Sequence, residues 1–98
     1  MAFPNYIRPK EAEIITKIIE KALGLSYFIS VNDGLNWALK QSIDFEAITS
    51  EVAATDVTIL RFRTSEREEI GNILLIHGND EDVVSDCTDT PRILELCS

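Results

Sequence analysis

The feature that most constrains the fold is a stripe of isoleucines near the start of the chain. Apolar residues recur there at the i, i+1, i+4, i+5 and i+8 spacing that places them on one face of a helix, namely Ile14, Ile15, Ile18, Ile19 and Ala22. Pro9 suits the first turn of such a helix, and Gly24 suits the residue just past its end. The pattern predicts a helix over residues 8–23 that needs another layer of structure to cover its isoleucines.

Five later segments have the composition of β-strands, with alternating apolar residues or β-branched and aromatic runs. They are LSYFISV (25–31), LNWALKQ (35–41), DVTILRFR (56–63), NILLIH (72–77) and DVVSDC (82–87). NILLIH is apolar on both faces at its centre, which predicts a central strand that is covered on both sides. Asp44 is placed to cap a second helix, and Thr90 followed by Pro91 predicts the start of a third.

The two strands around Asn32-Asp33-Gly34 read as a hairpin whose register can be argued from the alternation. A three-residue loop sets apolar residues opposite one another, pairing Val31 with Leu35, Ile29 with Trp37 and Tyr27 with Leu39. A two-residue loop would instead set Val31 against a polar residue. We therefore expect the three-residue loop, with Gly34 left-handed at a bulge, and Trp37 as a core aromatic on a face of the sheet.

The predicted order of elements is α-β-β-α-β-β-β-α. Short loops between sequential strands favour antiparallel pairing. The sequence therefore predicts an α+β fold, with a mostly antiparallel sheet of about five strands and helices packed mainly on one face. At 98 residues the chain has the length of one domain, which we expect to span residues 1–98.

The net charge is −8, and nearly all of it comes from the second half of the chain. Residues 1–49 carry five basic and six acidic side chains, whereas residues 50–98 carry four basic and eleven acidic ones. Binding to nucleic acid or to an anionic membrane draws on basic patches, so neither is expected directly. A basic protein partner fits this charge better. No signal peptide and no apolar run of membrane-spanning length is visible, so we expect a cytoplasmic protein.

The acidic residues gather in GNDEDVVSDCTD and in one earlier loop, and they form the predicted partner-binding surface. They are Asp80, Glu81, Asp82, Asp86, Asp89, Glu66, Glu68 and Glu69. Because the strand NILLIH joins the two acidic loops, we expect two acidic poles at opposite ends of a sheet, with Asp56 near the second. Charge on an edge strand also resists unwanted pairing between sheets, an explanation that needs no partner.

Metal and acid–base chemistry are disfavoured by spacing. A calcium loop counted from Asp80 would need an oxygen ligand at Val84 and a glycine at Ser85. In a strand, Asp82 and Asp86 share a face but lie roughly 13 Å apart, too far to share a proton. No metal and no cofactor is therefore expected, although an irregular ion site at Asp80 and Asp82 stays open as an alternative.

The thiols and the single histidine also fail to form a recognisable site. Cys87 and Cys97 match no metal spacing, and in a reducing compartment we expect them to be free thiols, with a disulfide between them as the alternative. A tight turn at 78–81 would place His77 at a strand end near Asp82, and Cys87 on the order of 13–20 Å away. A thiol–imidazole catalytic pair is thus excluded by distance, and no catalytic residue is predicted.

The stretches SYFISVNDGLNWALKQSID and GNILLIHGNDEDVVSDCTD resemble those of small, uncharacterised bacterial and phage-associated proteins. The resemblance implies an accessory protein of a mobile element, and it assigns no residue a role. The leading hypothesis is a non-enzymatic inhibitor, anti-CRISPR or DNA-mimic-like, that binds a basic host protein. The alternatives are a small metal-dependent enzyme or ion-binding domain around the Asp80/Asp82 turn, and a structural or immunity-type subunit that dimerises.

Overall fold

The computed structural model describes residues 8–66 and 68–97, except the side chain of Glu81. Its elements follow the predicted order: α1 (Pro9–Gly24), β1 (Phe28–Asn32), β2 (Trp37–Ser42), α2 (Phe45–Ala53), β3 (Val57–Arg63), β4 (Glu69–Ile76), a short 3-10 helix η1 (Asp80–Asp82), β5 (Val84–Cys87) and α3 (Pro91–Cys97). The predicted first helix is therefore confirmed to within one residue at each end. No helix among the described residues is long and apolar enough to cross a membrane.

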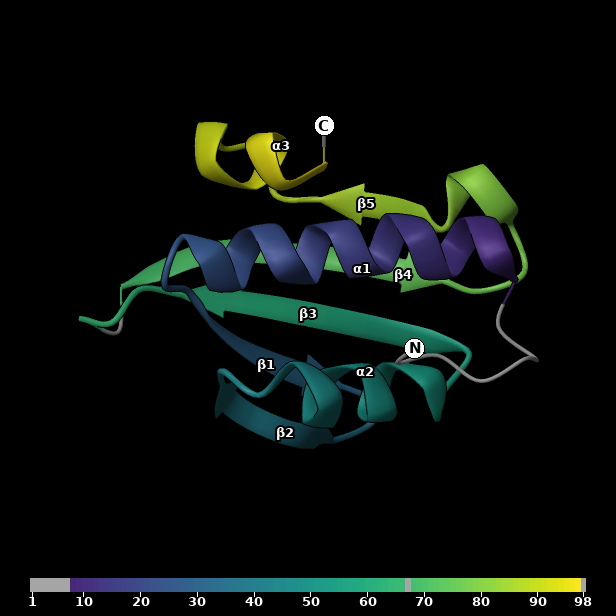
Figure 1. Ribbon diagram of the computed structural model, residues 1–98, viewed down its shortest axis with the longest axis horizontal. Coiled ribbons are helices and arrows are strands. Elements are labelled where there is room, and N and C mark those ends of the chain that lie inside the picture. Colours follow the sequence, from purple (N-terminus) through teal and green to yellow (C-terminus); the bar gives the residue numbers. More distant parts are fainter. Residues whose placement is uncertain (1–7, 67, 98) are drawn as a thin grey trace.

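The five strands form one antiparallel sheet in the order β2-β1-β3-β4-β5. All three helices lie on the same face of this sheet, with α1 along its middle and α2 and α3 on either side (Figure 1). The predicted α+β fold with a one-sided helix layer is confirmed. No helix of the described residues lies on the opposite face of the sheet, and we call it the open face.

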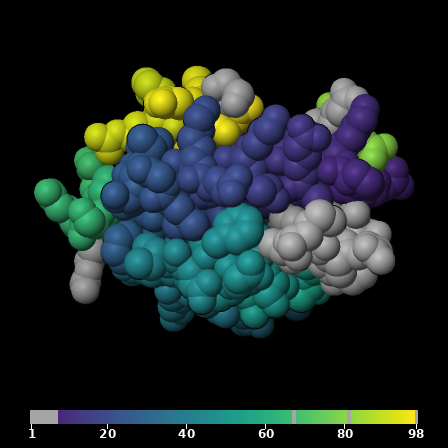
Figure 2. Space-filling model, viewed as in Figure 1, coloured from purple at the N-terminus to yellow at the C-terminus, as the bar shows by residue number. Residues whose placement is uncertain are grey.

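The isoleucine stripe of α1 forms the centre of the core. Ile15, Ile18 and Ile19 are fully or almost fully buried, and the sheet meets them with a row of side chains that includes Leu60 and Phe62. Figure 2 shows the helical face, where α1 crosses the molecule between α2 and α3. Burying each such side chain contributes about 1.5–3 kcal/mol, so this layer supplies much of the stability of the fold.

The predicted register of the first hairpin is wrong. Asn32 pairs with Trp37, Val31 with Leu39 and Ile29 with Ser42, and bulges interrupt the ladder. The four-residue connection also leaves Leu35 outside the ladder, with 89% of its surface exposed. Val31 points toward the helices, so the next residue, Asn32, points away from them, and its partner Trp37 does the same. Trp37 is therefore half-buried on the open face and is not a core aromatic.

Hydrogen bonds that two side chains accept from backbone N–H groups explain this longer loop. Asn32 accepts a hydrogen bond from the backbone N–H of Gly34 at 2.8 Å. Asp33 accepts from Asn36 at 2.8 Å and from Leu35 at 3.0 Å, and these two bonds hold the pKa of Asp33 below its ordinary value. Local bonds of this kind set the loop length, and bulges in the β1–β2 ladder then shift the register away from the one that the apolar alternation predicts.

Two further expectations about the sheet are wrong. β4 is central, but only its inward residues, such as Ile73 and Leu75, are buried. Leu74 and Ile76 are half-buried on the open face, because no helix covers that side. β5 begins at Val84, two residues later than expected, and Asp82 belongs to the preceding turn.

Gly71 in β4 permits the close approach of the last helix. It has a φ of +150°, and a Cβ atom there would lie 2.7 Å from Cγ1 of Ile93 and 2.8 Å from Cβ of Thr88. Ile93 is fully buried in α3, so it has little room to move. The absence of a side chain at Gly71 is what lets α3 pack on the sheet.

We expect Gly71→Ala to lower the free energy of unfolding by about 1–3 kcal/mol, because the new methyl group overpacks the contact with α3. Thermal and urea unfolding would measure the change. Gly24→Ala is the matched control, since no atom lies within 4 Å of the added methyl group. Equal stabilities of the two variants would contradict this role of Gly71.

Candidate functional site

Glu11 is the most unusual polar residue of the fold, because its side chain is only 1% exposed. It lies in the first turn of α1, four residues before Ile15, and so falls on the inward face of the helix. Its Oε2 accepts hydrogen bonds from the backbone N–H groups of Gly78 and Asp80, at 2.9 and 2.8 Å. Both of these residues have positive φ angles. The carboxylate therefore fastens the strained β4–β5 turn to the start of α1.

His77 lies on the other side of the same carboxylate. Its Nδ1 is 3.3 Å from Oε1 of Glu11, and its side chain is only 10% exposed. The end of β4 lies near Asp82 as expected, because Ile76 donates its backbone N–H to the carbonyl of Val83, but the carboxylate beside the imidazole is that of Glu11. Neither ring nitrogen has a hydrogen-bond partner within the described chain, and both are buried.

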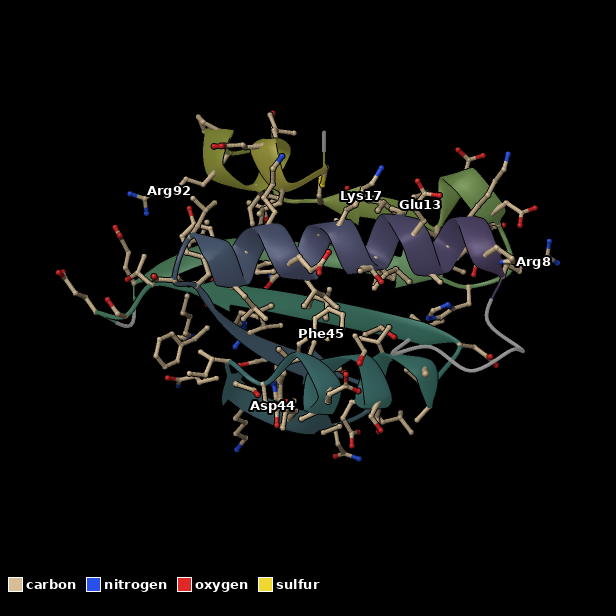
Figure 3. All side chains as sticks on the ribbon, in the orientation of Figure 1. Arg8, Glu13, Lys17, Asp44, Phe45 and Arg92 are labelled. Carbon is tan, nitrogen blue, oxygen red and sulfur yellow. The ribbon has the colours of Figure 1, made fainter. Side chains whose placement is uncertain are left out.

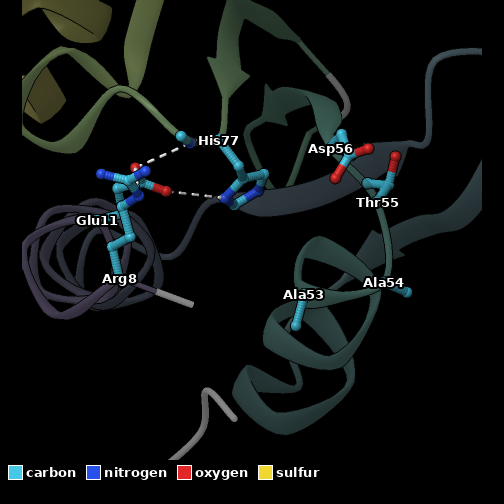
Figure 4. A pocket seen from close by; sticks show the side chains of 8 residues that line it. Arg8, Glu11, Ala53, Ala54, Thr55, Asp56 and His77 are labelled. Atoms are coloured by element: carbon cyan, nitrogen blue, oxygen red, sulfur yellow. Dashed lines mark hydrogen bonds and ion pairs between the residues drawn. The ribbon is translucent and has the colours of Figure 1, made fainter. Parts of the chain in front are cut away.

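A cavity of about 400 Å³ opens beside this pair, between the start of α1, the end of α2 and the end of β4. Figure 4 shows His77 between Glu11 and Asp56 in this cavity. The lining residues are Arg8, Glu11, Ala53, Ala54, Thr55, Asp56, His77 and Gly78. A carboxylate beside an imidazole can position a base, but here both ring nitrogens are buried and do not face solvent. The geometry favours a role in bracing the turn.

The two cysteines lie close together, at the end of β5 and the end of α3. Both are free, and both pack against the core from β5 and α3. Burial, together with a hydrogen bond to the thiol of Cys87, raises the pKa of Cys97 to about 11. Cys87 pairs with Ile73, so it lies four strand positions, or roughly 13 Å, from His77.

Four of the eight predicted surface carboxylates are exposed and form no ion pair with a described residue. Three others have internal counter-charges: Asp80 contacts Arg8 at 3.0 Å, Glu68 contacts Arg92 at 3.3 Å, and Glu69 contacts Arg63 at 3.4 Å and Arg61 at 3.6 Å. The side chain of Glu81 lies outside the described residues. The four without a cation are Glu66, Asp82, Asp86 and Asp89.

The arrangement of the acidic loops can be followed from backbone contacts. His77 donates its backbone N–H to the carbonyl of Asp56, which places Asp56 next to the turn that carries Asp80 and Asp82. Glu66 lies in the β3–β4 turn at the other end of the sheet. Over residues 8–66 and 68–97, no three His, Cys, Asp or Glu side chains are grouped so that they could hold a metal ion.

Sequence reasoning missed Glu11, although a signal for it was present. The residue occupies an inward position of the helix, and a carboxylate there needs hydrogen-bond donors from another element. Its donors come from a turn 67 residues later, which local sequence patterns do not reveal.

We expect Glu11→Ala to lower the free energy of unfolding by about 2–4 kcal/mol, because two charge-assisted hydrogen bonds to the turn are lost. Glu11→Gln should recover most of this loss, since an amide oxygen can still accept from both N–H groups. Chemical unfolding would measure both. Glu13→Ala is the control, because Glu13 lies beside Lys17 on the exposed side of α1 (Figure 3) and such pairs contribute less than about 1 kcal/mol. Equal losses for Glu11→Ala and Glu13→Ala would contradict the role of Glu11.

We expect Cys97 to resist alkylation in the folded protein. With a pKa of about 11, only about 0.3% of the thiol is ionised at pH 8.5, against about 24% at its ordinary value of 9.0. Iodoacetamide should modify Cys97 tens of times more slowly in the folded chain than in urea, as followed by peptide mass spectrometry. In Cys87→Ser the rate should rise but stay below that in urea, because burial persists. Equal rates in the folded and unfolded chains would contradict this environment.

Comparison with known proteins adds no identification: no family model, no curated protein and no solved structure matches this chain.

Proposed function

We propose that this protein is a non-enzymatic binding protein that contacts a basic partner protein through the acidic edge of its sheet. We define the acidic edge as Asp82, Asp86 and Asp89, which lie on β5 and on the residues that flank it. The observation that carries the proposal is that all three are exposed and form no ion pair with a described residue. Their charge is available to an external cation.

The contrast with the other acidic residues supports the acidic edge as the contact surface. Asp80, Glu68 and Glu69 already have arginine partners within the fold, so a partner protein would have to displace those arginines. The acidic edge has no such competition. Exposed charges of one sign steer a partner of opposite sign toward the surface and raise the rate of association.

The finer form of the proposal concerns the kind of partner. A chain of 98 residues with a net charge of −8 suits an accessory inhibitor that covers the basic surface of a nucleic-acid-binding host protein. The resemblance to small phage-associated proteins supports the same class, which includes anti-CRISPR and DNA-mimic proteins. The alternative of an ion site at Asp80 and Asp82 receives less support, because the carboxylate of Asp80 already forms an ion pair with Arg8.

The acidic edge could also serve only to keep β5 from pairing with other sheets, and charge reversal separates the two explanations. We expect basic proteins of the host cell to be retained by the immobilised wild-type protein and released as salt rises, because the Debye length shrinks to about 8 Å at physiological ionic strength. The double variant Asp82→Lys/Asp86→Lys should bind the retained protein at least about tenfold more weakly, since close interfacial charge pairs contribute about 1.5 kcal/mol or more. Pull-down with mass spectrometry, followed by titration of the purified partner, would measure this.

The matched control is Glu20→Lys/Glu46→Lys, which changes the net charge by the same amount on exposed positions of α1 and α2. It should bind the partner as the wild type does. Equal weakening by both double variants would show that only the overall charge matters. Unchanged binding by Asp82→Lys/Asp86→Lys would reject the acidic edge as the contact surface.

A further inference from the structure

The open face of the sheet carries a local charge opposite to that of the whole chain. Over β1, β2 and β3 it presents Lys40, Arg61 and Arg63, which are three of the nine basic residues. These three cations line one cavity of about 260 Å³ together with Trp37, Ser30 and Gln41. We call these six residues the basic patch. A carboxylate of the fold, Glu69, lies beside Arg61 and Arg63, and Lys40 adds an exposed third cation.

Strand pairing explains why these residues share the open face. Ser30 pairs with Arg61, and Phe28 pairs with Arg63, so the side chains of both pairs project to the side opposite the buried Ile29 and Val31. Trp37 joins them because the loop of the first hairpin shifts the register of β2. The patch is thus a consequence of the hairpin geometry that the apolar alternation failed to predict.

Contacts within the fold hold the patch in place. The guanidinium carbon of Arg61 lies 4.2 Å from the centre of the Trp37 ring, within the range of a cation–π contact. Nε of Arg61 also donates to Oδ1 of Asn72 at 3.4 Å. Gln41 has a φ of 47°, and its backbone N–H donates to the hydroxyl oxygen of Ser30 at 2.9 Å. A surface fixed in this way loses less conformational freedom on binding.

We propose that the basic patch binds an acidic segment of a partner protein. Glu69 shows that a carboxylate can sit beside both guanidinium groups, since its Oε1 lies 3.6 Å from Nε of Arg61 and 3.4 Å from Nη2 of Arg63. The polar contacts of Arg61 with described residues are made by its Nε, so its remaining N–H donors can bind a second carboxylate while Glu69 stays in place. Lys40 adds an exposed cation, and the half-buried ring of Trp37 adds apolar area beside the charges.

The charge balance favours an acidic peptide over a nucleic acid. A nucleic acid draws its affinity from many phosphate contacts, and the basic patch offers three cations on a chain with a net charge of −8. Single-stranded nucleic acids also need open aromatic faces for stacking, but Arg61 already lies over the ring of Trp37. Two or three carboxylates of a short peptide need no more than the cations present.

This surface is separate from the acidic edge, and its binding does not depend on the proposed function. The patch centres on β1, β2 and β3, whereas the acidic edge lies along β5, at the opposite edge of the sheet. The signs of the two surfaces are opposite, so each selects a different partner. A protein with both could bring a basic protein and an acidic segment together.

Trp37 is the single tryptophan of the chain, so its fluorescence reports directly on the patch. We expect a peptide of alternating glutamate and alanine to change Trp37 emission in a saturable way at low ionic strength. The anisotropy of the same peptide, labelled with a dye, should give the same affinity. In Arg61→Gln/Arg63→Gln the affinity should fall at least about tenfold, because charge-assisted hydrogen bonds to the peptide are lost.

Three controls separate this result from general effects. Lys17→Gln/Arg92→Gln removes two exposed cations of the helix layer and should leave peptide affinity unchanged. Asp82→Lys/Asp86→Lys should retain peptide binding even if it abolishes binding of a basic partner. Circular dichroism and thermal melting would confirm that each variant is folded.

Several outcomes would overturn the proposal. They are the absence of saturable binding in both measurements, equal affinity of the wild type and Arg61→Gln/Arg63→Gln, and equal weakening by Lys17→Gln/Arg92→Gln. Tighter binding of a single-stranded oligonucleotide than of a peptide with the same charge would also overturn it, and would assign the patch to nucleic acid instead.

Discussion

The contact between the isoleucine stripe of α1 and one face of the sheet is the interaction on which the rest of the structure depends. It uses the apolar side of a single helix to cover a sheet in which five strands lie side by side. α2 and α3 complete the cover on either side of α1, and α3 can do so only because Gly71 has no side chain. Since α1, α2 and α3 all lie on one side, none of these helices covers the open face. The surface available for binding follows from this asymmetry of the core.

Which carboxylates keep an unpaired charge depends on where the fold places them, and less on where they stand in the sequence. The sequence places most of the acid in the second half, but folding gives Asp80, Glu68 and Glu69 arginine partners from elsewhere. The pairs of Asp80 and Glu68 are exposed and add little stability, and the effect of all three is to remove carboxylates from the free acidic surface. The acidic edge remains at the β5 edge of the sheet, and the basic patch lies toward the β2 edge. The net charge of the chain gives no indication of the basic patch.

Sequence patterns predicted the elements and their order because those depend on local periodicity. The stripe of Ile15, Ile18 and Ile19 needs only the helical repeat, and the antiparallel pairing needs only short connections. The register of the first hairpin was mispredicted, since Asn32 and Asp33 bond to the loop backbone and override the apolar alternation. That shift moved Trp37 from the expected core to the open face, where it joins the basic patch.

Glu11 illustrates the other limit, where a residue is explained by a partner far along the chain. An apolar residue at this inward position would pack with the stripe, but it would leave the backbone N–H groups of Gly78 and Asp80 without an acceptor. The carboxylate accepts from both N–H groups and so fixes the turn that leads into β5. The position of the acidic edge therefore depends on a buried charge at the opposite end of the sequence. For the same reason, a substitution at Glu11 should disturb the position of β5, and with it the proposed contact surface, even though Glu11 itself is buried.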